Sequence, residues 1–227
     1  MQRYKWLTGG IFILLAAFIL FSPSLSYEFV NWDDELNIHE NIHVRNFDIE
    51  GIFTSHVIGN YNPLSNLTFA VEYRLVGENP WWYHFNNLML HLLCTLLVLI
   101  LLKKMEIPIW VSFVTALLFA IHPMRVESVV WITERKDVLF GSFYLLSLIF
   151  YIQYIRQKKA WYYVLALLVF ILSLLSKIQA VALPLSLLLV DYWFSRKLSK
   201  KLVLEKIPFF VLSMVTVKLP LDDQFPA

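Results

Sequence analysis

The sequence contains little charge and almost no cysteine, and each shortage excludes a class of protein. Charged residues make up 16% of the 227 residues, and the formal net charge is only +2. Such a chain offers no strongly basic surface, so no nucleic-acid partner is expected. The single cysteine, Cys94, lies within an apolar run and cannot form a disulfide within the chain. The sequence also contains no internal repeat, low-complexity tract or separate soluble domain.

Apolar residues, in contrast, dominate the sequence. They make up 59% of the chain, whereas soluble proteins typically contain about 45–50%. They gather in seven runs, each near the length that a bilayer-spanning helix needs. The chain is therefore predicted to be an all-α, polytopic membrane helix bundle. The predicted spans are residues 7–25, 87–102, 109–122, 138–155, 161–175, 178–194 and 207–219.

The first apolar run has a second interpretation. Arg3 and Lys5 precede it, and Ser24-Leu25-Ser26 loosely resembles the cleavage site of a secretory signal peptide. We favour an uncleaved first helix, because several apolar spans follow it.

Basic residues predict the orientation of the bundle. A cytoplasmic N-terminus places most of them on the cytoplasmic side, as the positive-inside rule requires. Two polar loops, residues 27–85 and 123–137, then share the outer side. We therefore expect an integral, multi-pass protein of a bacterial inner membrane or the endoplasmic reticulum. Of the 19 lysine and arginine residues, the cytoplasmic set comprises Arg3, Lys5, Lys103, Lys104, Arg156, Lys158, Lys159, Arg196, Lys197, Lys200, Lys201 and Lys206.

The first outer loop is too long for a simple connector. Within it, Leu64, Leu67, Val71 and Leu75 recur at helical spacing, which predicts short helices along the membrane surface. We assign residues 1–220 to one transmembrane module and residues 221–227 to a C-terminal tail.

Three adjacent carboxylates, Asp33, Asp34 and Glu35, follow the first span. In the plainer interpretation they are solvated surface charges or a helix cap. In the functional interpretation, neighbouring carboxylates shift each other's pKa so that one acts as a general base. Asp33 and Asp34 could instead hold a hard divalent cation such as Mg²⁺ or Mn²⁺, which is the one cofactor that the sequence suggests.

The second outer loop mixes acids, bases and a histidine at one membrane depth. Read as one helix, it places Glu127, Trp131 and Glu134 on a single face. An interfacial amphipathic helix with internal ion pairs would explain the mixture. Against that interpretation, such a mixture suits a site that binds an anionic phosphate and also moves a proton. The ionisable residues of the loop are His122, Arg125, Glu127, Glu134, Arg135, Lys136 and Asp137.

Two further polar residues lie inside or between spans. His91 lies about one turn inside the second span, on a stripe with His84 and Asn87, and an interhelical hydrogen bond is its plainer role. Lys177 separates two apolar runs. It either extends along the helix surface to the interface or contacts a lipid phosphate.

Several stretches resemble a known enzyme family. The chain is similar to the membrane domain of GT-C-fold glycosyltransferases that use polyprenyl-phosphate sugars. The likeness is to the transmembrane O-mannosyltransferases with tetratricopeptide repeats and their bacterial relatives, over most of residues 1–210. The matching stretches are FVNWDDELNIHENIHV (29–44), YNPL (61–64), NPWWYHFNNLMLHL (79–92), HPMRVESVVWITERKDVL (122–139) and, more weakly, LLSKIQAVALPLSLLLVDYW (174–193).

The resemblance implies a reaction and a set of residues. A sugar such as mannose would pass from a dolichyl- or undecaprenyl-phosphate donor to a hydroxyl of a protein or glycan acceptor at the outer face. By this resemblance, Asp33, Asp34 and Glu127 are the candidate catalytic residues. The candidate residues for binding the donor phosphate or substrate are His91, His122, Arg125, Arg135, Asp137 and Lys177.

Members of that family are much longer and usually carry a helical-repeat domain. The resemblance therefore implies that this chain is a truncated product or one module of a larger assembly. A catalytically inactive membrane protein of the same ancestry is the first alternative. A transporter is the second, although transporters usually place their charged sites near the bilayer midplane.

Overall fold

A computed structural model of the chain describes residues 2–224, and the side chains of residues 4–217 within them. Every regular element in this range is a helix, and its only extended pairing is an isolated bridge between Val57 and Asn60. The predicted all-α membrane bundle is confirmed. Residues 225–227, at the end of the predicted tail, lie outside the described residues.

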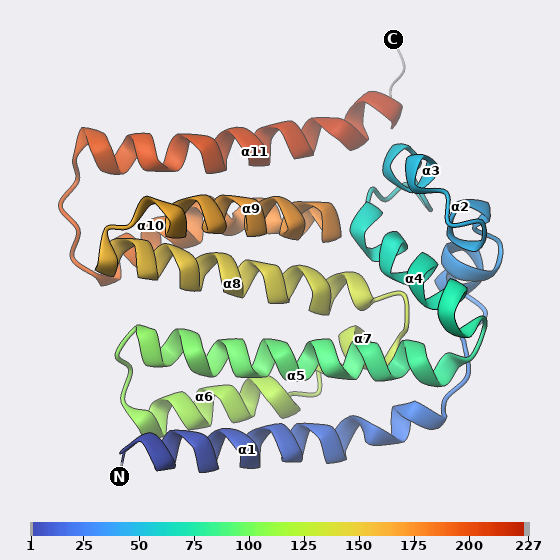
Figure 1. Cartoon of the computed structure of the whole chain (residues 1–227), viewed down its shortest axis with the longest axis horizontal. Coiled ribbons are helices and arrows are strands. Elements are labelled where there is room, and N and C mark those ends of the chain that lie inside the picture. Colours follow the sequence, from blue (N-terminus) through green and yellow to red (C-terminus); the bar gives the residue numbers. More distant parts are fainter. Residues whose placement is uncertain (1, 225–227) are drawn as a thin grey trace.

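Long helices run side by side and form the bundle (Figure 1). Three segments are long and apolar enough to cross a membrane: Tyr4–Ser26, Pro80–Lys104 and Arg135–Gln157. The predicted apolar runs lie within the bundle helices, except that His122 and Phe194 each fall one residue beyond a helix end. The bundle helices are α1 (Gln2–Phe21) with its extension η1 (Ser22–Ser26), α5 (Pro80–Lys104), α6 (Ile109–Ile121), α8 (Arg135–Gln157), α9 (Ala160–Ser176), η3 (Ile178–Ala182), α10 (Leu183–Trp193) and α11 (Lys200–Gln224).

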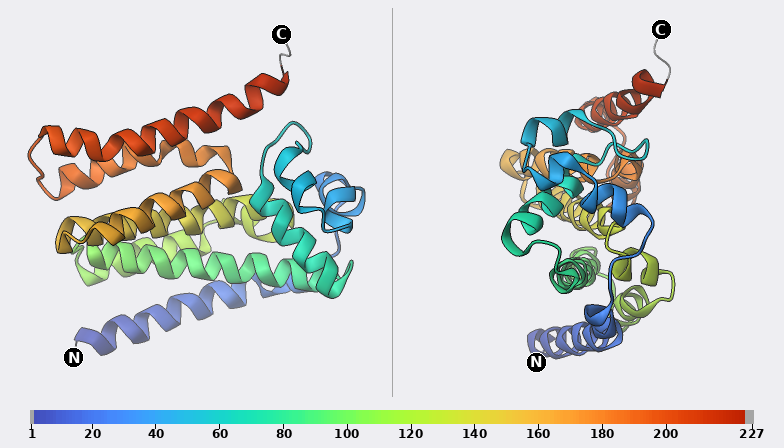
Figure 2. Two further views of the ribbon diagram at one scale, coloured as in Figure 1. Left: turned by 45° about the horizontal axis from the view of Figure 1, so that its top comes forward. Right: turned by 90° about the vertical axis from the view of Figure 1, so that its right-hand side faces the viewer.

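The first polar loop folds into a small helical lobe beside one end of the bundle (Figure 2). Its elements are η2 (Glu35–His39), α2 (Ile42–Arg45), α3 (Ile49–Thr54) and α4 (Pro63–Val76). The predicted amphipathic segment is therefore helical. Proline at the first position starts α4, and Gly77, with a φ of +63° that favours glycine, ends it.

Apolar side chains hold this lobe against the bundle. Ile38, Val44, Ile52 and Phe69 are fully buried, and they pack with Tyr83 from the start of α5. The helix α5 begins earlier than the second apolar run because Asn79 caps it: its side chain accepts from the Trp81 N–H at 3.2 Å, and Pro80 follows.

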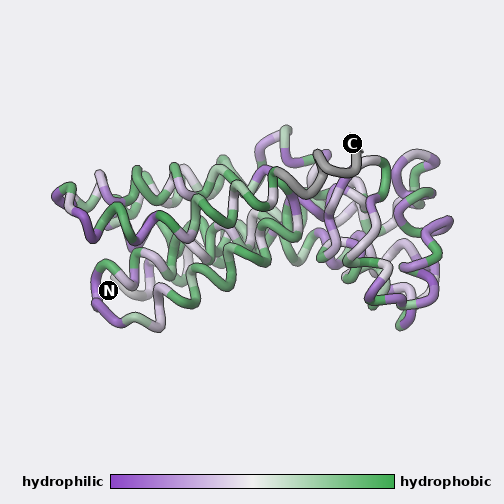
Figure 3. The backbone as a smooth tube through the Cα atoms, turned by 90° about the horizontal axis from the view of Figure 1, so that it is seen from above, coloured by the Kyte–Doolittle hydropathy of each residue, from purple (hydrophilic) through white to green (hydrophobic). Residues whose placement is uncertain are grey.

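The two ends of the bundle differ in character. We call the end that carries α2–α4 the loop end. We call the opposite end, where the α5–α6, α8–α9 and α10–α11 connections lie, the basic end (Figure 1). Lysine and arginine residues gather at the basic end. Hydrophilic residues lie at both ends of the bundle, and apolar residues lie between them (Figure 3). The two polar loops therefore lie at one end, as predicted.

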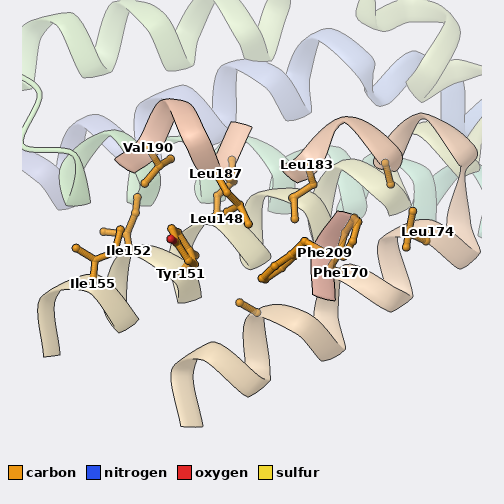
Figure 4. Packing of buried hydrophobic residues seen from close by; sticks show 12 residues of the cluster. Leu148, Tyr151, Ile152, Ile155, Phe170, Leu174, Leu183, Leu187, Val190 and Phe209 are labelled. Atoms are coloured by element: carbon orange, nitrogen blue, oxygen red, sulfur yellow. The ribbon is translucent and has the colours of Figure 1, made fainter. Parts of the chain in front are cut away.

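Small and hydroxyl-bearing residues let the bundle helices approach one another. Ser147 of α8 donates to the Ala166 carbonyl of α9 at 2.8 Å, and Ser173 of α9 donates to the Phe140 carbonyl at 2.9 Å. Such contacts are typical of helix packing in membranes. The largest apolar cluster joins α8, α9, η3, α10 and α11 around Tyr151, Phe170, Leu187 and Phe209 (Figure 4).

Candidate functional site

Asp34 joins the two polar loops. Its side chain is buried, and one carboxylate oxygen accepts from the Trp131 Nε1–H and the Thr133 N–H, each at 3.1 Å. The other oxygen accepts from the Val30 N–H at 3.1 Å. Trp32 and Trp131 add a ring contact with centroids 5.9 Å apart. The predicted meeting of the two loops is therefore present, and this carboxylate forms its centre.

Asp33 and Glu127 are free carboxylates in the part of the chain that the structure describes. Asp33 is half-buried, Glu127 is exposed, and neither side chain has a hydrogen-bond or ion-pair partner there. Glu127 lines a pocket of about 330 Å³ together with Asp34 and His84, which we call the histidine pocket. Two of the three candidate catalytic residues thus share one cavity.

The second polar loop forms a shorter helix than expected. The helix α7 spans Arg125–Val130 and ends because Trp131 adopts an extended conformation, with φ −78° and ψ 122°. That turn directs the Trp131 indole and the Thr133 amide toward Asp34. The expectation of one helical face through Glu127, Trp131 and Glu134 is therefore wrong.

Arg135 lies in a buried network and lines neither the histidine pocket nor the second cavity described below. Its guanidinium forms an ion pair with Glu72 and donates to Asn87 Oδ1 at 2.7 Å and to the Tyr83 carbonyl at 2.9 Å. It also donates to Thr68 Oγ1 at 3.3 Å, so four of its five N–H groups have a partner. The residue is 1% exposed, so we assign Arg135 to tying α4, α5 and α8 together instead of binding a donor phosphate.

Lys177 contacts two carboxylates. Its ammonium forms an ion pair with Asp137 and lies 3.3 Å from Glu134 Oε2. Burial lowers the pKa of Lys177, but the hydrogen bonds and charges of Asp137 and Glu134 outweigh it, so its pKa is raised. Lys136 pairs with Glu134 at 2.8 Å, and Ser128 donates to Asp137 Oδ2 at 2.9 Å. Lys177 thus fixes Asp137 in place and has its charge balanced by protein groups.

A second cavity of about 520 Å³, which we call the arginine cleft, lies on the other side of α7. Residues of α8 and Phe119 of α6 form much of its wall, and its polar lining residues include His91, Arg125, Ser128, Asp137 and Gln179. Arg125 has no ion-pair partner among the described residues, and its buried Nε finds no hydrogen-bond acceptor. The guanidinium lies over the Phe119 ring, 4.8 Å from its centroid.

The two other candidate histidines, His91 and His122, lie in different settings. His91 donates through Nε2 to the Ala120 carbonyl at 2.8 Å, which confirms the interhelical hydrogen bond expected from its place in the span. Its Nδ1 is buried and has no partner, and the residue lines the cleft. His122 is exposed, and its Nδ1 accepts from the Met124 N–H at 3.2 Å, so this ring shapes the turn before α7.

The carboxylates do not form an evident metal centre. Among the side chains of residues 4–217, no group of three or more His, Cys, Asp or Glu residues is arranged to hold a metal ion. The oxygens of Asp34 are already surrounded by three N–H donors, which a hard cation would repel. The residues present therefore do not fit a divalent cation at Asp34, and a cation at Asp33 stays a prediction.

Some residues of these networks escape sequence reasoning. Glu72, the counter-ion of Arg135, lies on α4 with no local signal that pairs it with a residue 63 positions away. Ser128 and Thr133 take part through a hydroxyl and a backbone amide, which carry no distinctive pattern. Only the placement of α4 and α7 brings them to the site.

Comparison with known proteins identifies the relatives of this fold and site. The human protein O-mannosyl-transferase TMTC1 is 37% identical over 149 residues, covering 60% of this chain and 17% of the human protein. Tmtc2 of Drosophila melanogaster is 30% identical over 162 residues, covering 66% of this chain and 17% of the fly protein. This chain is similar to the protein O-mannosyl-transferases. The resemblance inferred from its motifs is confirmed.

These relatives are much longer than the matched region. The mouse protein O-mannosyl-transferase TMTC2, for example, is 36% identical over 99 residues, which is 44% of this chain and 12% of the mouse protein. The chain thus spans less than a fifth of the length of the curated relatives it matches. No protein-family model matches the chain, and no solved structure is significantly similar to it.

Proposed function

We propose that this chain is the membrane module of a glycosyltransferase that moves a sugar, in the first place mannose, from a polyprenyl-phosphate donor to an acceptor hydroxyl. The observation that carries the proposal is the arginine cleft. An apolar groove with one unpaired guanidinium at its polar part suits a ligand that joins a long hydrocarbon to a phosphate. The names of the relatives support the sugar and the transfer.

The short helix α7 relates the two cavities. Arg125 and Ser128 line the arginine cleft, whereas Val126, Glu127 and Val130 line the histidine pocket. A donor phosphate at Arg125 would therefore lie one helix width from the carboxylates. We assign the donor to the cleft, with Asp137 and His91 on its wall, and the acceptor hydroxyl to the side of Glu127.

The reaction follows from these assignments. The acceptor oxygen attacks the anomeric carbon, a carboxylate takes the hydroxyl proton, and the bond between that carbon and the phosphate oxygen breaks. Asp33 and Glu127 are the candidate bases because their oxygens have no partner among the side chains of residues 4–217, whereas Asp34 holds the loops together. Arg125 stabilises the charge that develops on the departing lipid phosphate.

The proposal is tested by separating donor binding from transfer. Wild-type chain in nanodiscs, Arg125→Gln and Arg74→Gln would be titrated with a fluorescent polyprenyl-phosphate mannose. Arg74 is an exposed arginine of the loop end, so its variant removes the same charge away from the cleft. Loss of one charged hydrogen bond should weaken binding about 10- to 100-fold in Arg125→Gln only. Equal affinity in all three proteins would refute the assignment of the cleft.

A second experiment addresses catalysis. Asp33→Asn and Glu127→Gln should keep donor binding, and at least one of them should abolish transfer to a Ser/Thr peptide. The second candidate function is a non-catalytic donor-binding module, because the guanidinium of Arg125 could hold a phosphate in the cleft without the carboxylates of the other cavity. Donor binding that depends on Arg125, without turnover in the wild-type chain, would favour that candidate.

A further inference from the structure

The ring nitrogens of His84 can form hydrogen bonds that neither the contacts between the polar loops nor the arginine cleft uses. The residue lies in the first turns of α5 and is only 2% exposed. Neither ring nitrogen makes a hydrogen bond of normal geometry, although the backbone oxygens of Tyr27, Glu28 and Val130 lie near the ring. A buried polar group without a partner is destabilising, so its presence calls for a role that packing does not supply.

The surroundings of His84 indicate what it could bind. The ring lines the histidine pocket, whose volume of about 330 Å³ falls within the range of small-ligand sites. Valine and isoleucine side chains and two aromatic rings, Tyr27 and Trp131, form most of the wall. The ring of Tyr27 meets the imidazole edge-on with centroids 6.3 Å apart, which holds the ring without using its nitrogens.

Three carboxylate residues line the pocket: Glu28, Asp34 and Glu127. Asp34 already accepts from three N–H groups, so it is not the partner that His84 lacks. The carboxylate of Glu127 is free among the described residues. A ligand in this pocket would therefore meet one imidazole, the carboxylate of Glu127 and the exposed carboxylate of Glu28 in a mostly apolar setting.

We infer that the histidine pocket is a subsite for a hydroxyl-bearing group, and that His84 positions its oxygen through a hydrogen bond. A neutral imidazole carries one N–H donor and one nitrogen acceptor, and a hydroxyl is likewise both donor and acceptor. Glu127 then faces the same oxygen. The inference deepens the proposed function, on which it rests for the identity of the ligand: the hydroxyl belongs to the acceptor or to the transferred sugar.

The test compares His84→Phe, which keeps a flat ring but no nitrogen, with His84→Asn, which restores one donor and one acceptor. Leu93→Ala, at an exposed position of α5, is the matched control. We would measure transfer kinetics, donor binding and thermal unfolding of the full chain in nanodiscs. The expected result is an increase of about tenfold in the KM of a Ser/Thr peptide for His84→Phe, partial recovery for His84→Asn, and unchanged donor affinity and melting temperature. An increase confined to the KM of the sugar donor would place the sugar hydroxyl, instead of the acceptor, at His84.

A second readout does not depend on turnover. In ¹⁵N-histidine-labelled protein, N-acetyl-threonine amide or methyl α-mannoside should shift the imidazole nitrogen signals of His84, and the responding probe identifies the source of the hydroxyl. Shifts without donor binding at the cleft would support the hydroxyl subsite and refute the proposed function. Donor binding that depends on Arg125, with unshifted His84 signals and wild-type kinetics in His84→Phe, would overturn the inference and leave the proposed function standing. An equal loss of stability and activity in both His84 variants would also overturn it.

Discussion

The two ends of the bundle use charge in opposite ways. At the basic end, Asp191 lies 2.7 Å from Arg196 and 2.5 Å from Lys206, and Arg196 lies 2.8 Å from Glu205. Tyr151 donates to Asp191 at 2.9 Å, which completes a closed network. The network thus supplies Asp191 with two basic partners.

At the loop end, paired and unpaired groups stand side by side. The Arg135 and Lys177 networks are closed, but Asp33, Arg125 and Glu127 have no ionic partner among the side chains of residues 4–217. Two of these, Arg125 and Glu127, line cavities. Closed networks hold helices together, whereas charges that stay open beside a cavity have bonding capacity left for a ligand.

The largest effect is expected when one charge is removed from the closed network at the basic end. Asp191→Asn keeps the shape of the side chain but removes the charge that faces Lys206, which is 3% exposed. An uncompensated buried charge typically costs about 3–5 kcal/mol. We expect a large drop in the thermal unfolding temperature with no selective effect on donor binding per folded molecule. Combining Asp191→Asn with Lys206→Met should recover part of the loss, and an unchanged melting temperature in the single variant would contradict the assignment.

The adjacent aspartates offer the next largest effect. Asp34→Asn places an amide N–H where the carboxylate accepts from N–H groups, so it should destabilise the loop end by about 1–3 kcal/mol. Asp33→Asn replaces a carboxylate without partners among the described residues and should leave stability unchanged. Thermal unfolding and sugar transfer measured on both variants separate structure from chemistry. If Asp33→Asn proves the more destabilising of the two, the division of roles between them is wrong.

The fold was largely predictable because apolar periodicity and length mark each bundle helix. It was also predictable that the two polar loops lie at the same end of the bundle, since the basic residues of the short connections gather at the other end. The partners of individual charges were not. Arg135 and Arg125 look alike in sequence, yet the first is enclosed by α4, α5 and α8 and the second faces a cleft.

The difference between these arginines arises from tertiary placement. Glu72 reaches Arg135 only because α4 folds back over the start of α5, and Trp131 reaches Asp34 only because α7 ends at Val130. A single sequence encodes both events without a local signature. Site residues predicted from residue type alone therefore include both ligand contacts and structural pairs.

The Lys177 network gives a smaller effect with a characteristic pH dependence. The pKa of Lys177 is raised above its ordinary value of 10.5, because Asp137 and Glu134 favour the charged form. Its contribution is therefore fully present below about pH 10.5 and is lost as the pH rises through the folded-state pKa. Lys177→Met should destabilise by about 1 kcal/mol at neutral pH, since the pair is part-exposed. The difference in unfolding temperature from the wild type should shrink above pH 10.5. A constant difference across this range would exclude an ionic origin.

The smallest effect is expected where a charge pair of the basic end faces water. Arg156 lies 2.7 Å from Glu106, but the Glu106 side chain is 74% exposed. Solvent and salt screen such a pair, so Glu106→Gln should change the free energy of unfolding by less than about 0.5 kcal/mol. The free energy of unfolding of Glu106→Gln and of Asp191→Asn would be measured at low and high salt. Both acids pair with arginines at the same end, so the two variants differ mainly in how deeply the acid is buried. A loss in Glu106→Gln as large as that in Asp191→Asn would mean that net charge, rather than closure of a buried network, stabilises this end of the bundle.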